Sequence, residues 1–328
     1  MLVQGDSANH AHEPLSPCAG EREEKASGRV PRVCPCAPVA SRLGYFARTC
    51  RQMSAWTEAI DLINNAGSAQ AVPARRLRWP PVLKKKLPIT VTGMPGAGKT
   101  QLFSALTAKG TRQGESAVAD AGYARTTNRR LAWAVRTIPG AASTNRDSLT
   151  DRLFESGRTR LYGLVHVVSY GYNTIWDGEL TLESQLRSKG LAELRTYQRK
   201  QELADFEELV NLITRKTKRA AADQDLWPQW LLIVVNKADL FWSDISQAGE
   251  YYLPGSNSPF DDRRHQLAAH FGGIFDFKCE TLPVALSAAP FRFTARQMNL
   301  TVESQLSSEQ MAISVELLRS RLEALSGF

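Results

Sequence analysis

Short apolar segments alternate with amphipathic stretches along the chain from residue 88 onward. Strands separated by helices are typical of βα units around a mainly parallel sheet, so the pattern predicts an α/β fold. A further strand could pair with the second one as a hairpin across Asn128 and Arg129. The predicted strands are Ile89–Thr92, Leu131–Thr137, Leu161–Ser169, Leu231–Asn236 and Thr281–Leu286, with the further strand at Tyr123–Thr127.

Two later stretches carry the single apolar stripe of an amphipathic helix. Before the fourth strand, and again at the end of the chain, apolar side chains recur at steps of 3 and 4 residues. Ser307 and Gln310 stand at the spacing of a capping box in front of the second stretch, which is predicted to pack on the sheet. The stripes are Leu203, Phe206, Val210 and Ile213 in the first stretch, and Met311, Val315, Leu318, Leu322 and Leu325 in the second.

The chain divides into three predicted parts. Residues 1–52 carry five prolines and scattered charges without a period of 2 or 3.6 residues, which predicts disorder. Residues 53–87 are predicted to form a short amphipathic helix and a basic linker. Residues 88–328 hold the alternating pattern, with an enlarged helical region around 182–222. One hypothesis is that translation in the cell begins at Met53.

Composition places the chain among ordinary globular proteins. Of its 328 residues, 43% are hydrophobic and 23% are charged, which argues against collagen-like, coiled-coil and wholly disordered chains. The longest clean apolar run, Trp230–Val235, is far shorter than the ~20 residues of a membrane-spanning helix. The N-terminus lacks the apolar stretch of a signal peptide, and the five cysteines lack metal-ligand spacing. We therefore expect a cytoplasmic protein with reduced thiols.

The net charge of +8 is locally concentrated. The segment Arg75–Lys86 contains six basic residues and no acidic one. Such a run can follow the phosphates of a nucleic acid or an anionic membrane surface, but it is more often a solvated linker. No aromatic ladder is interleaved with it, so the linker is the favoured interpretation.

The strongest chemical signal directly follows the first predicted strand. The segment Gly93–Thr100 fits the pattern G-x-x-x-x-G-K-[ST], and a helix is predicted to begin at once. Backbone N–H groups of such a loop and the positive end of the helix converge on an anionic pocket that suits a triphosphate. A side chain at Gly93 or Gly98 would push the backbone away from the phosphate oxygens. Lys99 would place its charge between the β- and γ-phosphates, and Thr100 would offer its hydroxyl to Mg²⁺. The residues predicted to bind this part of the nucleotide are Gly93, Gly96, Ala97, Gly98, Lys99, Thr100 and Gln101.

A second signal follows the fourth predicted strand, where the chain reads Asn236-Lys237-Ala238-Asp239. The carboxylate of Asp239 can accept hydrogen bonds from the ring N–H and the exocyclic amine of guanine together. Adenine cannot satisfy that pair, because its ring nitrogen is an acceptor, and an unpaired buried carboxylate is costly. Asn236 would brace the loop, and Lys237 could lie along the base. Alone, this tetrapeptide could be a polar turn, but its position before the last αβ unit favours a base-reading loop.

A third signal is the tripeptide Ser287-Ala288-Ala289 after the fifth predicted strand. Small residues at Ser287 and Ala288 would let a backbone N–H reach the carbonyl oxygen of guanine. Taken alone, the tripeptide is equally typical of an ordinary turn. The order of phosphate loop, base-reading loop and small-residue loop, each at the carboxyl end of a strand, favours a single site.

These three segments, in this order, resemble the first, fourth and fifth motifs of the Ras-like, translation-factor-related (TRAFAC) class of P-loop GTPases. The matching residues are GMPGAGKT at 93–100, NKAD at 236–239 and LSAA at 286–289, and the resemblance covers about residues 88–328. It implies the three-layer P-loop NTPase fold, with a mainly parallel sheet and helices on both faces. It also implies GTP and GDP as ligands, Mg²⁺ as the metal, and two switch segments that sense the γ-phosphate.

The third motif departs from the family pattern. Where the class has Asp-x-x-Gly or Asp-x-Pro-Gly, this chain reads Thr137-Ile138-Pro139-Gly140. The N–H of Gly140 could still contact a γ-phosphate, but Thr137 stands in the place of the aspartate that holds the water shell of magnesium. Ala141 stands where many members have the glutamine that orients the attacking water. Both departures predict slow or partner-stimulated hydrolysis.

The resulting hypothesis is a guanine-nucleotide-binding molecular switch with a protein effector or activator. Its catalytic candidates are Lys99, Thr100 and Gly140, and its metal candidates are Thr100 and, from the proportions of the switch region, Ser116. Two alternatives stay open. One is a GTP- and GDP-binding module that recruits partners without hydrolysis, and the other is an ATP-using P-loop protein such as a kinase. The helical region at 182–222 is the predicted partner surface.

Overall fold

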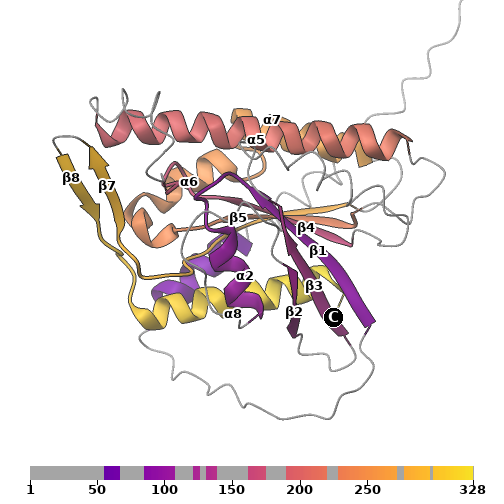
Figure 1. Ribbon diagram of the computed structural model, residues 1–328, viewed down its shortest axis with the longest axis horizontal. Coiled ribbons are helices and arrows are strands. Elements are labelled where there is room, and N and C mark those ends of the chain that lie inside the picture. Colours follow the sequence, from indigo (N-terminus) through magenta and orange to yellow (C-terminus); the bar gives the residue numbers. More distant parts are fainter. Residues whose placement is uncertain are drawn as a thin grey trace, which may run out of the picture. The chain divides into compact units, whose positions relative to one another are not determined.

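The computed structural model contains a central six-stranded sheet with helices around it (Figure 1). The residues that it describes are 55–66, 85–107, 121–125, 131–138, 162–174, 190–219, 228–271, 277–295 and 298–327. The strand order is β2-β3-β1-β4-β5-β6. β2 is antiparallel to β3, and all the other neighbouring pairs are parallel. The strands are β1 (Lys85–Gly93), β2 (Ala121–Arg125), β3 (Leu131–Thr137), β4 (Gly163–Val168), β5 (Trp230–Val235) and β6 (Lys278–Pro283).

Burial on both faces explains the continuous apolar strands at the middle of the sheet. β4 and β5 are buried along their whole length. Along β5, Leu231, Ile233 and Val235 contribute to one hydrophobic core, whereas Leu232 and Val234 contribute to another. A strand between two covering layers therefore has no polar face, which is typical of parallel sheets.

Helices cover both faces of the sheet (Figure 1). α5, α6 and α7 pack against one face, and α2 and α8 pack against the other. The predicted three-layer α/β fold, with a mainly parallel sheet between helices, is confirmed. The helices are α2 (Lys99–Thr107), α5 (Leu191–Arg219), α6 (Ile245–Tyr252), α7 (Pro259–Phe271) and α8 (Ser308–Leu325).

The strands agree with the predicted strands except at their ends. β3 has the predicted bounds, and the predicted pairing of β2 with β3 is confirmed, with Ala121 opposite Arg136. β1 begins earlier than predicted, because Lys85 already pairs with Leu131 of β3. Side-chain hydrophobicity alone could not show this, since Lys85 and Lys86 join the strand through their backbone.

The start of α8 confirms the predicted capping box. The N–H of Gln310 donates to Ser307 Oγ at 3.3 Å, and the N–H of Ser307 donates to Gln310 Oε1 at 2.8 Å. The predicted stripe of α8 needs one correction, because Ser314 is fully buried and Val315 is not. Ser314 Oγ accepts from the N–H of Ala285 at 2.8 Å, so this helix also fixes the end of the segment that follows β6.

A helix over residues 55–64 packs against the part of the chain that contains the six-stranded sheet. Its Ile63 shares a small core with Ala285 and Leu306. Trp242 Nε1 donates to Asn64 Oδ1 at 2.9 Å, and Gln310 Nε2 donates to the carbonyl of Ile63 at 3.2 Å. The predicted short amphipathic helix is thus present. It packs against residues close to both predicted base-binding loops, such as Trp242 after the first loop and Ala285 before the second.

The strands β7 (Phe291–Ala295) and β8 (Met298–Val302) go beyond the predicted elements. They follow β6 and precede α8 in the sequence, and they form a separate two-stranded sheet (Figure 1). α5 is 29 residues long and occupies the part of the enlarged helical region that lies within the described residues. No helix in the described segments combines the length and the apolar character needed to cross a membrane.

Candidate nucleotide-binding site

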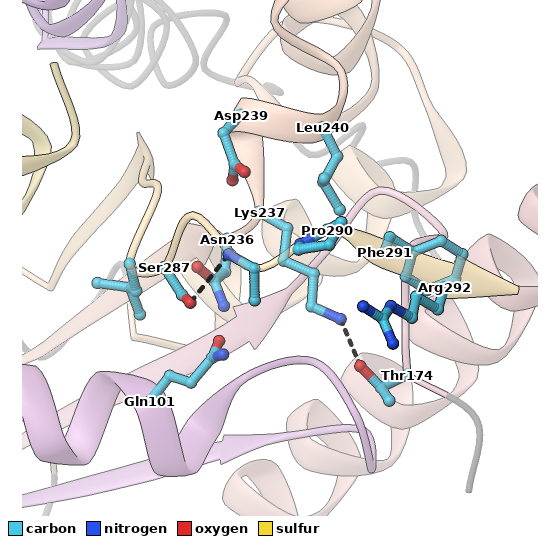
Figure 2. A pocket seen from close by; sticks show the side chains of 12 residues that line it. Gln101, Thr174, Asn236, Lys237, Asp239, Leu240, Ser287, Pro290, Phe291 and Arg292 are labelled. Carbon is cyan, nitrogen blue, oxygen red and sulfur yellow. Dashed lines mark hydrogen bonds between the residues drawn. The ribbon is translucent and has the colours of Figure 1, made fainter. Parts of the chain in front are cut away.

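Three loops meet at the carboxyl ends of β1, β5 and β6, because these strands run parallel in one sheet. They surround the pocket drawn in Figure 2. Its lining is Gln101, Thr174, Asn236, Lys237, Asp239, Leu240, Leu286, Ser287, Ala289, Pro290, Phe291 and Arg292. The loop Gly93–Thr100 adjoins the pocket through hydrogen bonds from the side chains of Asn236 and Lys237.

The glycines of the loop Gly93–Thr100 are required by their protein neighbours. Gly96 and Gly98 have φ values of 75° and 100°, which L-residues with a side chain rarely adopt. A Cβ at Gly96 would lie 2.2 Å from the carbonyl oxygen of Thr174, and a Cβ at Gly98 would lie 2.0 Å from Asn236 Nδ2. At Gly93 the clash would be with the carbonyl oxygen of Val167 at 2.2 Å. Close packing within the protein therefore requires glycine at these positions, and close approach of phosphate oxygens stays a prediction.

Lys99 and Thr100 end the glycine-rich segment and form the first two residues of α2, so the helix begins where it was predicted. Lys99 Nζ donates to the carbonyls of Gly93 at 2.7 Å and Met94 at 2.6 Å, so its ammonium lies over the loop. The N-terminus of α2 presents backbone N–H groups and the positive end of the helix dipole. This end of the site therefore gathers donors and positive charge, which suits an anion.

Asn236 joins the loop at 236–239, which the sequence predicts to read a base, to the loop Gly93–Thr100. Its Nδ2 donates to the carbonyl of Ala97 at 2.8 Å, and the side chain is fully buried. Its Oδ1 has no hydrogen-bond partner within the described part of the chain. The bracing role that the sequence suggested for Asn236 thus has a specific partner, the loop Gly93–Thr100.

Lys237 extends along the pocket toward Thr174 (Figure 2). Its backbone is left-handed, with φ of 58°, and its Nζ donates to the carbonyl of Gly96 at 2.9 Å. The same ammonium donates to the carbonyl of Tyr172 at 2.5 Å and to Thr174 Oγ1 at 2.9 Å. Burial lowers the pKa of Lys237 to about 7, against the negative charges of Glu202 and Asp239, which raise it. The stem of Lys237 remains along the pocket, where a base could lie on it.

Asp239 presents a buried carboxylate to the pocket (Figure 2). The residue is 1% exposed, and its Oδ2 has no hydrogen-bond partner among the residues described. Burial raises the pKa of Asp239 to about 6, although a hydrogen bond from Ser304 and the charge of Lys237 act in the opposite direction. A buried carboxylate oxygen without a donor is costly, so this position favours a ligand that supplies N–H groups.

The small-residue loop forms the pocket wall after β6. Ser287 and Ala289 line the pocket, and the N–H of Ala289 donates to Ser287 Oγ at 3.2 Å. Ala288, a predicted binding residue, is exposed and does not belong to the lining. Ser287 therefore lies at the pocket, together with Ala289 and without Ala288, and its contact with a nucleotide stays a prediction.

The predicted γ-phosphate end is only partly within the described residues. Ser116, Gly140 and Ala141 lie outside them. Thr137 ends β3 directly opposite Val91 of β1 and is 5% exposed. The side chain at the end of β3 is thus a hydroxyl, where the pattern of the resembled class has a carboxylate. The described residues contain no group of three or more His, Cys, Asp or Glu side chains arranged to hold a metal ion.

Thr174, Phe291 and Arg292 are among the lining residues that the sequence analysis missed. Phe291 is buried, its ring lies edge-on to Tyr172 at 5.4 Å, and Lys237 Nζ is 5.6 Å from its centroid. The alternating segment Phe291–Ala295 directly after the small-residue loop could have indicated a strand here. No sequence pattern indicated Thr174, because its place at the pocket depends on how the segment after β4 packs against Gly96.

The fold and the loop between β1 and α2 define the class of the chain as an α/β protein of the P-loop NTPase fold, as predicted. Solved structures that match the chain include the mammalian SRP receptor, at 17% identity and a TM-score of 0.39, over 73% of this chain and 99% of that one. The FeoB G-domain from Methanococcus jannaschii matches at 15% identity and a TM-score of 0.34, over 74% and 97%. The bacterial selenocysteine-specific elongation factor EF-Sec matches at 11% identity and a TM-score of 0.35, over 73% and 28%. No protein-family model and no curated protein matches the sequence.

Proposed function

We propose that this protein is a guanine-nucleotide-binding molecular switch that binds GTP and GDP. The observation that carries the proposal is the buried carboxylate of Asp239, whose Oδ2 lacks a partner within the described segments. It lines the same pocket as Asn236, which is hydrogen-bonded to the phosphate loop. A ligand that fits both ends carries phosphates at one end and a pair of neighbouring N–H donors at the other.

Guanine supplies that pair of donors through its ring N–H and exocyclic amine. Both would bind the carboxylate of Asp239, and the base would rest along the stem of Lys237. Adenine would place a ring acceptor against the carboxylate and leave it unsatisfied, which costs affinity. The second alternative from the sequence, an ATP-using kinase, is therefore disfavoured by the buried carboxylate.

At the phosphate end, Lys99 and the first N–H groups of α2 would hold the β- and γ-phosphates. Mg²⁺ fits this end only in part, because Thr100 offers a hydroxyl whereas Thr137 offers no carboxylate. Magnesium accepts nucleotide phosphates and water as most of its ligands, so Thr100 could suffice for binding. The metal would neutralise charge on the phosphates when bound, while Lys99 would orient them.

The proposed hydrolysis is slow or depends on a partner. Thr137 ends β3 where the resembled class has a carboxylate, and Ala141 carries no group that could orient water. The same observation on Thr137 favours a second candidate function, a GTP- and GDP-binding module that recruits an effector without hydrolysis. A cytoplasmic location, and a protein effector or activator at the region 182–222, belong to this proposal.

Calorimetry with the purified chain tests the proposal. We expect GDP and GTP to bind in the presence of Mg²⁺ and ATP to bind at least about a hundredfold more weakly. Equal affinity for ATP and GTP, or no affinity for either guanine nucleotide, would refute it. Single-turnover release of phosphate from bound GTP, with and without cell extract, then separates the switch from the module that does not hydrolyse.

A further inference from the structure

Glu202 of α5 is a buried carboxylate that organises the segment after β4. The residue is 1% exposed, and its Oε1 accepts from the N–H groups of Ser169 at 3.0 Å and Gly171 at 3.3 Å. The same oxygen accepts from Ser169 Oγ at 3.1 Å and Asn173 Nδ2 at 2.8 Å. Its Oε2 accepts from the hydroxyl of Tyr252 at 2.6 Å. A carboxylate with this many donors holds the chain around it in one conformation.

Gln198 lies one turn earlier on α5 and holds the same segment. Its Nε2 donates to the carbonyl of Asn173 at 3.0 Å, and its Oε1 accepts from the N–H of Asn173 at 3.1 Å. This pair of bonds satisfies both backbone groups of one residue, as a neighbouring strand would. Glu202 and Gln198 together fix the path of residues 169–173.

The next residue of the segment touches the proposed phosphate site. The N–H of Thr174 donates to the carbonyl of Gly96 at 3.1 Å, and its backbone fills the space that a side chain at Gly96 would need. Thr174 Oγ1 and the carbonyl of Tyr172 both accept from Lys237 Nζ. A continuous series of hydrogen bonds therefore runs from α5 through this segment to the phosphate loop and the base-reading loop.

We propose that Glu202 is a positioning residue of the nucleotide site, which acts through residues 169–174 on Gly96 and on the ammonium of Lys237. The inference rests on the proposed function, since it assigns a regulator to that same site. The hydrogen-bond partners of Glu202 among the described residues belong neither to the phosphate loop nor to the pocket lining. Its effect is to hold the three acceptors of Lys237 in place and to supply a negative charge on the side of α5.

The pH dependence of GDP affinity distinguishes an electrostatic role of Glu202 from a purely structural one. The charged groups that act on Lys237 are Glu202 from α5 and Asp239 from its own loop, and Arg292 of β7 lines the same pocket. Lys237 has a pKa of about 7, and Glu202 raises it. Only the ammonium form can donate to all three acceptors and attract the phosphates, so affinity for GDP should fall as pH rises through this pKa. Removing the charge of Glu202 should move that fall to lower pH.

The test measures GDP affinity from pH 6.5 to 9 for the full chain and for Glu202→Gln. Glu208→Gln is the matched control, because it removes a carboxylate from the exposed face of the same helix. We expect Glu202→Gln to weaken GDP binding about tenfold at pH 7.5 and to shift the alkaline midpoint downward. The control should follow the wild type at every pH.

Gln198→Ala separates positioning from charge and serves if Glu202→Gln does not fold. It keeps the carboxylate but removes the bonds to Asn173, so GDP affinity should fall without a shift of the midpoint. The inference is overturned if Glu202→Gln matches Glu208→Gln, if its loss is equal at every pH, or if Gln198→Ala binds GDP as the wild type does. A wild type that does not bind GDP refutes the proposed function itself, and the inference falls with it.

Discussion

The base end and the γ-phosphate end of the proposed site differ in the chemistry they keep. At the base end, Asn236, Lys237 and Asp239 stand in one pocket, with hydrogen bonds that tie two of them to the phosphate loop. At the γ-phosphate end, β3 finishes with the hydroxyl of Thr137 where the family pattern has a carboxylate. Recognition of guanine and hydrolysis of GTP depend on different residues, so a chain can keep one while the other weakens.

The largest expected effect comes from Lys99, whose ammonium lies over the phosphate loop. Lys99→Ala removes a charge from the phosphate loop and should weaken GDP and GTP about a hundredfold, since hydrogen bonds to charged groups are the strong ones. The ratio of GDP to ADP affinity should stay unchanged, because Asp239 is untouched. Lys200→Ala, on the exposed side of α5, is the control and should bind as the wild type. A changed base preference in Lys99→Ala would contradict the separation of the two ends.

A smaller effect should follow acidification. Asp239 has a pKa of about 6 in the free protein, above the ordinary carboxyl value, and guanine requires its ionised form. On the acid side, affinity for GDP should therefore fall by about tenfold for each pH unit below about pH 6. It should be highest between this pKa and the pKa of about 7 of Lys237, above which the alkaline fall begins. Calorimetry from pH 4.5 to 7 measures this limb.

Asp239→Asn is the control for the acid limb, since the phosphates of GDP also titrate. What remains of the pH dependence in this variant belongs to the nucleotide. An unchanged slope between the wild type and Asp239→Asn would show that Asp239 does not meet the base.

The smallest expected effect probes the γ-phosphate end. Thr137→Asp restores the carboxylate of the family pattern and should raise the rate of Mg²⁺-dependent GTP hydrolysis by about fivefold without changing GDP affinity. Thr137→Asn matches the size without the charge and should leave the rate unchanged. Phosphate release in a single turnover measures both variants. Equal rates in the two would mean that Thr137 is not the reason for slow hydrolysis.

The sequence predicts those parts of the molecule that depend on local pattern. The strands, the capping box of Ser307 and Gln310, and the glycine-rich loop all follow from short-range spacing, and the structure contains them. Gly93–Thr100 also shows what spacing cannot reveal, because its glycines are constrained by Thr174, Val167 and Asn236, which are distant in the chain.

The residues that sequence reasoning missed depend on long-range contacts. Glu202 reads as one of several acidic residues on a long polar helix, and only its burial beside Ser169 distinguishes it. In the sequence Arg292 is one of many basic residues, and only the position of β7 in the structure shows that it lines the pocket. Neither position could be found from periodicity, since both depend on how distant segments pack.

The most direct measurement is a competition between GDP and XDP for the wild type and for Asp239→Asn. Xanthine carries a second carbonyl in place of the exocyclic amine of guanine, so it suits an amide at Asp239. Asp262→Asn, on the exposed face of α7, is the control and should behave as the wild type. We predict that the wild type prefers GDP by at least about a hundredfold and that Asp239→Asn prefers XDP. Unchanged preference for GDP in Asp239→Asn would contradict the central claim that this buried carboxylate recognises guanine.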